Sequence, residues 1–401
     1  MGNRDTKING DGTTSRERLQ EGTNKASSLF SRLRRSTAAE AYEETNPGPS
    51  EIGQHLRTGK FPWKSTGLRF SETNIRRFYD LKLRLLGRGT FGIVVTGRHR
   101  LSGIDFAVKI VQKTTVKNVD TKTMFYREID CLRSLHHRNI LRYYDFFEDD
   151  SFCYAILELC SGGDLLKRLK KMAVVTEEHV VNYVRQMLEA IHHCHERGIM
   201  HRDLKADNFL FLTNDDDSPL VLIDFGLALQ FEPGTKYTII CGSPRYIAPE
   251  VFEQAYDEKC DLWSLGIVVY AMLYGTHPFG VHSKSTFHEI RQEVSAGTVP
   301  YPNNPGLQPP SLLAQSFLQD LLQHNPAKRP NALEAMQHPW LLAPAAYLAD
   351  YQIHPEIRYL AYKRAAEGRL APMDDGVHRQ LAELQRMTVT ASRKGHSRYS
   401  N

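Results

Sequence analysis

Two short polar motifs, set among apolar segments, do most to limit what this chain can fold into. The first is His201-Arg-Asp-Leu-Lys-Ala-Asp-Asn208 and the second is Asp224-Phe-Gly226. Between them lie the apolar runs 209–212 and 220–223, whose aromatic and β-branched residues favour short strands. Both motifs therefore fall on neighbouring loops, where four polar side chains are hard to explain as a structural network.

The polar side chains of these two loops match the needs of phosphoryl transfer from ATP. Asp203 can orient an attacking hydroxyl and accept its proton, and Lys205 can neutralise charge on the transferred group. Asn208 offers a neutral oxygen to Mg²⁺, and Asp224 offers an anionic one. Because the transition state is loose, positioning and charge neutralisation account for most of the catalysis. The pattern predicts an enzyme that uses ATP and Mg²⁺.

A glycine-rich run, Gly87-Arg-Gly89-Thr-Phe-Gly92-Ile-Val94, precedes these motifs. Dinucleotide-dependent oxidoreductases use a similar run, but there it opens a helix. Here an apolar, β-branched segment follows directly, which favours a hairpin whose backbone can close over a triphosphate. A purely structural turn is the other interpretation of this run taken alone.

A lysine inside an apolar strand supports the nucleotide-binding interpretation. Lys109 lies in the run Phe106–Val111, where its charge is costly unless it meets an anion. Glu128 falls in the next expected helix and is the natural partner. We therefore expect Lys109 to lie near both Glu128 and the phosphates of the nucleotide.

The apolar pattern changes along the chain from strand spacing to helix spacing. Strands are expected around 81–85, 93–95, 106–111, 141–147 and 153–159, with one helix over 122–136. Further helices are expected over 164–172, 177–197, 260–275, 285–296, 311–323 and 331–341. We therefore predict an α+β, bilobal domain over 76–342, with a small antiparallel β lobe (76–158) and a larger helical lobe (159–342).

Both ends of the chain differ from this central part. Residues 1–75 contain few aliphatic residues, which predicts a mostly disordered N-terminal tail. Residues 343–401 are expected to form a charged, flexible C-terminal tail. Within it, Val377, Leu381, Leu384 and Met387 can line one face of a basic amphipathic helix.

Composition excludes several other functions. The net charge of +5 arises from interspersed signs, so no nucleic-acid partner is expected. The 6 cysteines show no C-x-x-C spacing and are expected to be free thiols in a reducing compartment. No apolar stretch reaches the roughly 18 residues that span a bilayer, and no signal peptide is visible. We expect a cytoplasmic protein.

With these motifs in this order, the chain resembles the eukaryotic protein kinases over about residues 78–342. Ala248-Pro-Glu250, Asp261-Leu-Trp-Ser-Leu-Gly266 and Arg329 match further landmarks of that family, and Arg329 matches the partner of Glu250. The resemblance implies a stack of Leu132, His201 and Phe225 between the lobes and a gatekeeper at Leu157. It also implies an ATP-binding set: Leu86, Gly87, Gly89, Gly92, Val94, Ala107, Lys109, Glu158, Cys160 and Leu210.

The same resemblance implies serine/threonine specificity. Lys205, two residues after Asp203, is the serine/threonine mark of the family, and Ser243 matches a hydroxyl that bonds both. A pseudokinase scaffold that binds nucleotide or partners without turnover is the alternative. Such a scaffold would usually have lost at least one of four residues, and all four are present here: Lys109, Asp203, Asn208 and Asp224.

The resemblance also bears on protein substrates. Asp164 and Asp207 match acidic positions that read a basic residue before the phosphorylated residue. Ala271 replaces a glutamate that relatives use for a second arginine. We therefore expect a single Arg or Lys about three residues upstream of the phosphorylated residue.

The segment from Leu210 to Ala228 is close to that of calcium-dependent and calmodulin-dependent protein kinases. The calcium-dependent enzymes carry EF-hands after the kinase domain, whereas this chain has no EF-hand motif. The basic helix expected in the C-terminal tail is then either a calmodulin target or an autoinhibitory segment. A helix packed on the large lobe and a solvated tail are the other interpretations.

Several modification sites are also expected. The N-terminus Met1–Lys7 fits N-myristoylation at Gly2, which predicts reversible membrane contact. Ser36 follows a basic cluster and resembles a phosphosite. Thr235 and Thr238, with the neighbouring Tyr237, are candidate switches, and a phosphate there can pair with Arg202. Solvated loop hydroxyls are the other interpretation.

Overall fold

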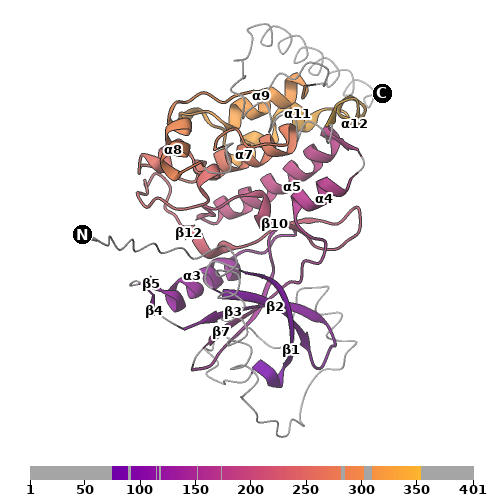
Figure 1. The fold of residues 1–401 in the computed structure, drawn as a ribbon, viewed down its shortest axis with the longest axis vertical. Helices are drawn as coiled ribbons and strands as arrows, with labels where there is room; N and C mark the ends of the chain where they lie inside the picture. The colour runs from indigo at the N-terminus through magenta and orange to yellow at the C-terminus, as the bar shows by residue number, and fades with distance from the viewer. Residues whose placement is uncertain are drawn as a thin grey trace, which may run out of the picture.

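A computed structural model describes residues 75–353 except 89–91, 114, 117–118, 151, 173, 281–284 and 302–308. The expectations for Gly2, Ser36, Gly89 and the helix over Val377–Met387 lie outside the described residues. Figure 1 shows two lobes stacked along the long axis, with the β-rich N-terminal part at one end and helices at the other. This arrangement confirms the predicted bilobal α+β fold.

The small lobe is an antiparallel five-stranded sheet in the order β1-β2-β3-β7-β6. Side chains alternate along β3, so that Ala107 and Val111 join the core shared with the large lobe, whereas Val108 and Ile110 join a separate small-lobe core. Lys109 is on the same face as Ala107 and Val111, toward the large lobe. The strands are β1 (Tyr79–Arg88), β2 (Gly92–His99), β3 (Asp105–Gln112), β6 (Tyr143–Glu148) and β7 (Phe152–Leu157), with a separate pair β4 (Thr115–Val116) and β5 (Val119–Asp120).

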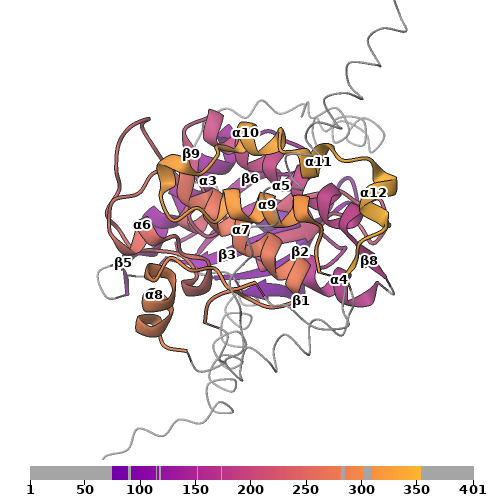
Figure 2. The same cartoon turned by 90° about the horizontal axis from the view of Figure 1, so that it is seen from above.

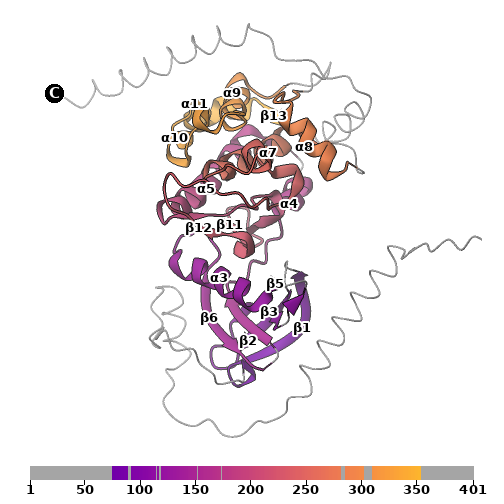
Figure 3. The same cartoon turned by 90° about the vertical axis from the view of Figure 1, so that its left-hand side faces the viewer.

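Helix α3 (Thr121–Ser134) is the main helix of the small lobe, as expected from the spacing of its apolar residues. It lies between the sheet and the short strand β12 (Leu229–Gln230) of the large lobe, as Figures 1 and 3 show. Its buried residues Phe125, Ile129 and Leu132 face the shared core. The helix is therefore packed against both lobes.

Helix α7 (Lys259–Tyr274) forms the centre of the large lobe, and almost every one of its side chains is buried. Figure 2 shows α7 near the middle of the helices, with α8 at the edge. A helix that is apolar all round is expected at such a central place. The other helices are α4 (Leu165–Lys171), α5 (Glu177–Glu196), α6 (Pro249–Phe252), α8 (Phe287–Ser295), α9 (Leu312–Leu321), α10 (Ala332–Met336), α11 (Pro339–Leu342) and α12 (Ala345–Ala349).

Short strand pairs carry the polar motifs at the junction of the lobes. Strand β10 (Phe209–Phe211) pairs with β11 (Leu220–Leu222), and β12 pairs with β9 (Ile199–Met200). One motif therefore connects β9 to β10, and the other follows β11 directly. This placement holds both polar loops beside α3 and β3.

The C-terminal end of the large lobe differs from the sequence expectation in two ways. The single helix expected over 331–341 is two helices, because Pro339 cannot donate a backbone hydrogen bond and instead begins α11. The described fold also continues past residue 342. Strand β13 (Gln352–Ile353) pairs with β8 (Val175–Thr176), and Glu177 N donates to Tyr351 O at 3.0 Å.

Candidate active site

The loop His201–Asn208, the expected catalytic loop, is held in place by Asp261 of α7. This carboxylate accepts hydrogen bonds from His201 N at 2.8 Å and from Arg202 N at 2.9 Å. It also lies 2.9 Å from His195 Nε2. Burial raises the pKa of Asp261, but the hydrogen bonds from His195 and His201 outweigh burial and hold that pKa below its ordinary value. A charged Asp261 thus fixes the backbone just before Asp203.

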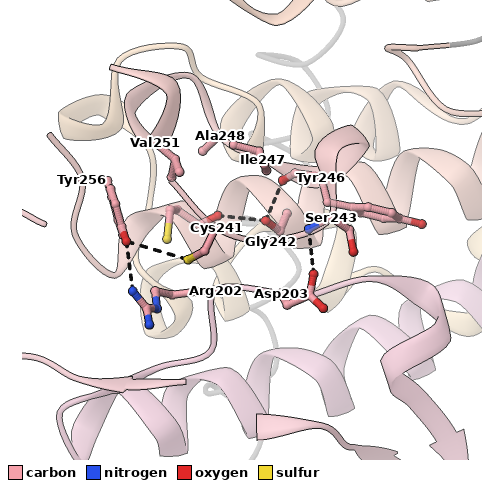
Figure 4. A pocket seen from close by; sticks show the side chains of 12 residues that line it. Arg202, Asp203, Cys241, Gly242, Ser243, Tyr246, Ile247, Ala248, Val251 and Tyr256 are labelled. Carbon is pink, nitrogen blue, oxygen red and sulfur yellow. Dashed lines mark hydrogen bonds between the residues drawn. The ribbon is translucent and has the colours of Figure 1, made fainter. Parts of the chain in front are cut away.

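Asp203, Lys205 and Ser243 form a connected polar triangle. Lys205 Nζ lies 2.7 Å from Asp203 Oδ2 and donates to Ser243 Oγ at 3.1 Å. Ser243 N donates to Asp203 Oδ1 at 2.8 Å, as Figure 4 shows. The structure therefore brings Asp203 and Lys205, which are expected to act on the substrate hydroxyl, together with Ser243.

The expected activation segment runs from Asp224 to Glu250. Within it, Gly242 allows the segment to approach the catalytic loop closely. Its φ is +105°, and a Cβ at this position would lie 2.6 Å from Arg202 O. Any other residue would be strained and would push the two loops apart. The neighbouring Ser243 could then no longer reach Asp203.

Asn208 and Asp224, the expected Mg²⁺ ligands, lie on adjoining segments, because Ile223 N donates to Asn208 O at 2.9 Å. Asn208 Nδ2 donates to Asp203 O at 2.8 Å, which leaves the amide oxygen for another partner. Asp224 has a left-handed backbone conformation (φ 63°) at the end of β11. Within the described part of the chain, three His, Cys, Asp or Glu residues do not gather into a metal cage. Mg²⁺ commonly needs only one or two protein oxygens, because substrate phosphates and waters complete its shell.

Lys109 connects the small lobe to this pair. Its Nζ lies 2.6 and 2.8 Å from the two carboxylate oxygens of Glu128 in α3, and 3.4 Å from Asp224 Oδ1. Burial lowers the pKa of Lys109, but the two carboxylates outweigh burial and hold that pKa above its ordinary value. Burial raises the pKa of Asp224, but Lys109, His201 and the Gly226 N–H outweigh burial and hold that pKa below its ordinary value. The site therefore holds a charged lysine beside a charged aspartate.

The expected nucleotide-binding residues lie around this lysine. In the sheet, Val94 is paired with Lys109, and Ala107 is paired with Leu157 of β7. Gly92 must be glycine, because a Cβ there would lie 2.0 Å from Ile110 O. Of the remaining described members of the set, Leu86 and Gly87 lie in the last part of β1, Leu210 lies within β10, and Glu158 and Cys160 follow β7.

Two of the three residues of the expected stack between the lobes are in contact. The rings of His201 and Phe225 meet edge to face with centroids 4.9 Å apart. Leu132 of α3 is buried in the same core. His201 Nε2 also lies 3.1 Å from Ile223 O, which ties the two polar loops to each other.

The activation segment is held by a tyrosine that the sequence did not indicate. Tyr256 is buried; its hydroxyl donates to Ile239 O at 2.8 Å and accepts from Arg202 Nη1 at 3.1 Å. It lines a small pocket under the segment, together with Cys241 and Cys260 (Figure 4). Arg202 Nε also donates to Leu227 O at 2.8 Å. The described hydrogen bonds of the Arg202 guanidinium thus go to neutral groups.

The expected phosphosites Thr235 and Thr238 are exposed on that segment. The described hydrogen bonds do not bring either side chain together with Arg202. Their role as switches therefore stays a prediction.

The two acidic residues expected to read the substrate come from different segments of the large lobe. Asp164 begins α4, and Asp207 is an exposed residue beside Asn208. A lysine that the sequence analysis did not consider, Lys167, lies 2.7 Å from Asp164 Oδ2. Its three-residue spacing from Asp164 on a helix was the signal that could have revealed it.

Together, the two lobes, the buried lysine–glutamate pair and the two polar loops define a phosphotransferase of the protein kinase class. A protein kinase domain model matches residues 81–341. The chain therefore belongs to the protein kinase family.

The similar proteins are also kinases. A probable myosin light chain kinase of Dictyostelium discoideum is 36% identical over 275 residues, which cover 68% of this chain and 69% of that protein. The calcium/calmodulin-dependent protein kinase cmkA of Emericella nidulans is 38% identical over 288 residues, 71% of this chain and 67% of that protein. CDPK-related kinase 7 of Arabidopsis thaliana is 37% identical over 264 residues, 64% of this chain but 45% of that protein.

These findings confirm the prediction of a serine/threonine protein kinase, and they do not support the pseudokinase alternative. Members of this family act on proteins and generally use ATP and Mg²⁺. None of the helices in the described residues has the length and apolar character needed to cross a membrane.

Proposed function

We propose that this chain phosphorylates serine and threonine residues that have one basic residue about three positions upstream. Asp203 orients the substrate hydroxyl and takes its proton, and Lys205 stabilises the charge that develops on the transferred group. Asn208 and Asp224 hold Mg²⁺. The observation that carries the proposal is the triangle of Asp203, Lys205 and Ser243, with both contacts of Lys205 at 2.7 and 3.1 Å.

The same proposal assigns the nucleotide site. Val94, Ala107 and Leu210 pack on adenine, and the backbones of Glu158 and Cys160 bind its edge. Lys109, held by Glu128 at 2.6 Å, pairs with the phosphates. The glycine-rich hairpin after Leu86, with Gly87, Gly89 and Gly92, closes over them.

The substitution Asp203→Asn tests the catalytic assignment. It keeps the size of the side chain but removes the proton acceptor, so kcat should fall by about 10²–10⁴-fold. The measurement is steady-state phosphorylation of a basic serine peptide with ATP and Mg²⁺. Asp80→Asn, an exposed carboxylate in β1, is the matched control and should keep wild-type activity. Equal turnover by the Asp203→Asn variant and the wild type would refute the assignment.

The tails supply regulation in this proposal. The C-terminal tail binds calmodulin or inhibits the kinase domain, and myristoylated Gly2 gives a cytoplasmic enzyme reversible membrane contact. Phosphorylation of Ser36, Thr235 or Thr238 modifies these states. The names of the relatives and the basic face expected over Val377–Met387 support the calmodulin arm.

Removing residues 354–401 tests the role of the C-terminal tail, because it keeps α12 and β13, which pack on the large lobe. An inhibitory tail predicts a several-fold rise in kcat/KM, and calcium–calmodulin should produce a similar rise in the full chain. Unchanged kcat/KM in both experiments would remove the tail from the account.

A further inference from the structure

The carboxylate of Asp164 is fully engaged by a single residue of its own helix. Oδ1 accepts a hydrogen bond from Lys167 N at 2.8 Å, which caps the start of α4. Oδ2 pairs with Lys167 Nζ at 2.7 Å. An arginine that approaches Asp164 therefore meets a carboxylate whose second oxygen already holds a cation.

Lys167 is also under the influence of the second acidic residue. The hydrogen bond and charge of Asp164, and then the charge of Asp207, raise the pKa of Lys167 above its ordinary value. Asp207 belongs to the catalytic loop, whereas Asp164 begins α4. One lysine thus partly neutralises two carboxylates that come from different elements.

Helix stability does not explain a lysine at this place. Lys167 is in the first turn of α4, where the partial positive charge of the helix end disfavours a cation. Its side chain is 75% exposed, whereas that of Asp164 is 18% exposed. Such an exposed pair is weak, and a lysine with four rotatable bonds leaves easily when another cation competes.

We propose that Lys167 is a displaceable internal cation that occupies the acidic pair Asp164 and Asp207 and thereby weakens selection for a basic residue in the substrate. The inference rests on the proposed recognition of that residue by the same two acids. Without Lys167 the pair presents two negative charges, and with it only one. A substrate arginine must displace the lysine before it can bind Asp164 through two hydrogen bonds.

The test compares two serine peptides that differ only in Arg or Ala at the third position upstream. The measured quantity is the ratio of kcat/KM for the Arg peptide to that for the Ala peptide. Lys167→Gln should raise this ratio roughly three- to fivefold, mainly through a lower KM for the Arg peptide, as is typical for one exposed charge pair. The increase should shrink at high salt, because exposed charges are screened.

Two further variants locate the effect. Lys170→Gln removes another exposed lysine from the same helix and should leave the ratio unchanged. Adding Asp207→Asn to Lys167→Gln should cancel most of the gained selectivity. A ratio in Lys167→Gln that stays within about 1.5-fold of wild type, or falls, would overturn the inference.

The outcomes also separate this inference from the proposed function. If the wild type phosphorylates neither peptide, the proposed function fails. If the wild type is active and only the response to Lys167→Gln is missing, the proposed function stands and the role of Lys167 falls. Weak discrimination by the wild type with strong discrimination by Lys167→Gln supports both.

Discussion

Among the described residues, each lobe contains a buried lysine or arginine that pairs with a glutamate far away in the sequence. In the small lobe Lys109 meets Glu128, and in the large lobe Arg329 meets Glu250. All four side chains are at most 5% exposed. The pairs are alike in charge and burial, so their different surroundings indicate what each one does.

The large-lobe pair is closed. Arg329 Nη1 and Nη2 lie 2.5 and 3.1 Å from the two oxygens of Glu250. Its remaining donors go to backbone carbonyls of Lys259 and Gln323, and its guanidinium lies over the ring of Trp263. Because every contact is within the large lobe, this pair fixes the end of the activation segment against the helices.

The small-lobe pair is open on one side. Besides Glu128, Lys109 contacts Asp224, which lies on the second polar loop, in the other lobe, and is 21% exposed. This contact is long, at 3.4 Å. The Arg329 pair therefore holds parts of one lobe together, whereas the Lys109 pair, in the proposed function, also presents a charge to the phosphates of the nucleotide.

Arg329→Ala should produce the largest effect on stability. It leaves Glu250 buried without a cation, and breaking such a pair typically costs about 3–5 kcal/mol of the free energy of unfolding. Urea unfolding followed by circular dichroism measures the loss. Arg133→Ala, an exposed arginine of α3, should cost under about 1 kcal/mol. A similar small loss in both variants would contradict the structural role of the Arg329 pair.

The contrast between the pairs also shows what the sequence could predict. The motifs around Asp203 and Asp224, and the Lys109–Glu128 pair, follow from local patterns whose chemistry is specific. The strands and helices follow from apolar periodicity, because their buried faces repeat at fixed spacing. Prediction was weaker where the outcome depends on distant segments that meet only in the fold.

Three particular features illustrate that limit. The sequence around Tyr256 does not distinguish it from any other buried tyrosine. Its role follows from the hydrogen bonds of its hydroxyl with Arg202 and Ile239 in the fold. The β13 strand is only two residues long and gains its place by pairing with β8. Glu177 begins α5 and is buried because Ser311 and Trp340, far along the chain, donate to it. In each case the decisive partner lies more than ten residues away in the sequence.

Lys109→Met should produce the next largest effect, and this effect should be chiefly a loss of catalytic activity. The substitution keeps most of the apolar stem but removes the charge that faces the phosphates. Loss of one such charge typically lowers kcat by about 10²–10³-fold, or about 3–4 kcal/mol of transition-state stabilisation. Steady-state kinetics measures the loss. Lys82→Met, a lysine of β1 paired with Asp105 at the surface, is the control and should retain near-wild-type kcat.

The same variant should show a smaller effect on stability that depends on pH. Burial raises the pKa of Glu128, and Lys109 opposes that rise in the wild type. Without the lysine the pKa of the Glu128 carboxyl in the folded protein should lie further above that of a glutamate in the unfolded chain, which is about 4.3. The unfolded state then binds fewer protons, so the stability of Lys109→Met should fall as pH rises, by up to about 1.4 kcal/mol per pH unit.

Urea unfolding of the three proteins between pH 5 and pH 8 measures this dependence. The Lys82→Met control should change in parallel with the wild type, because its partner Asp105 is partly exposed and keeps a second cation, Arg98. The Lys109→Met curve should diverge downward from both as pH rises. Parallel curves for all three would mean that water reaches Glu128 once the lysine is gone. In that case the small-lobe pair would be open to solvent as well as to the reactant, and its difference from the closed Arg329 pair would be larger than the contacts alone indicate.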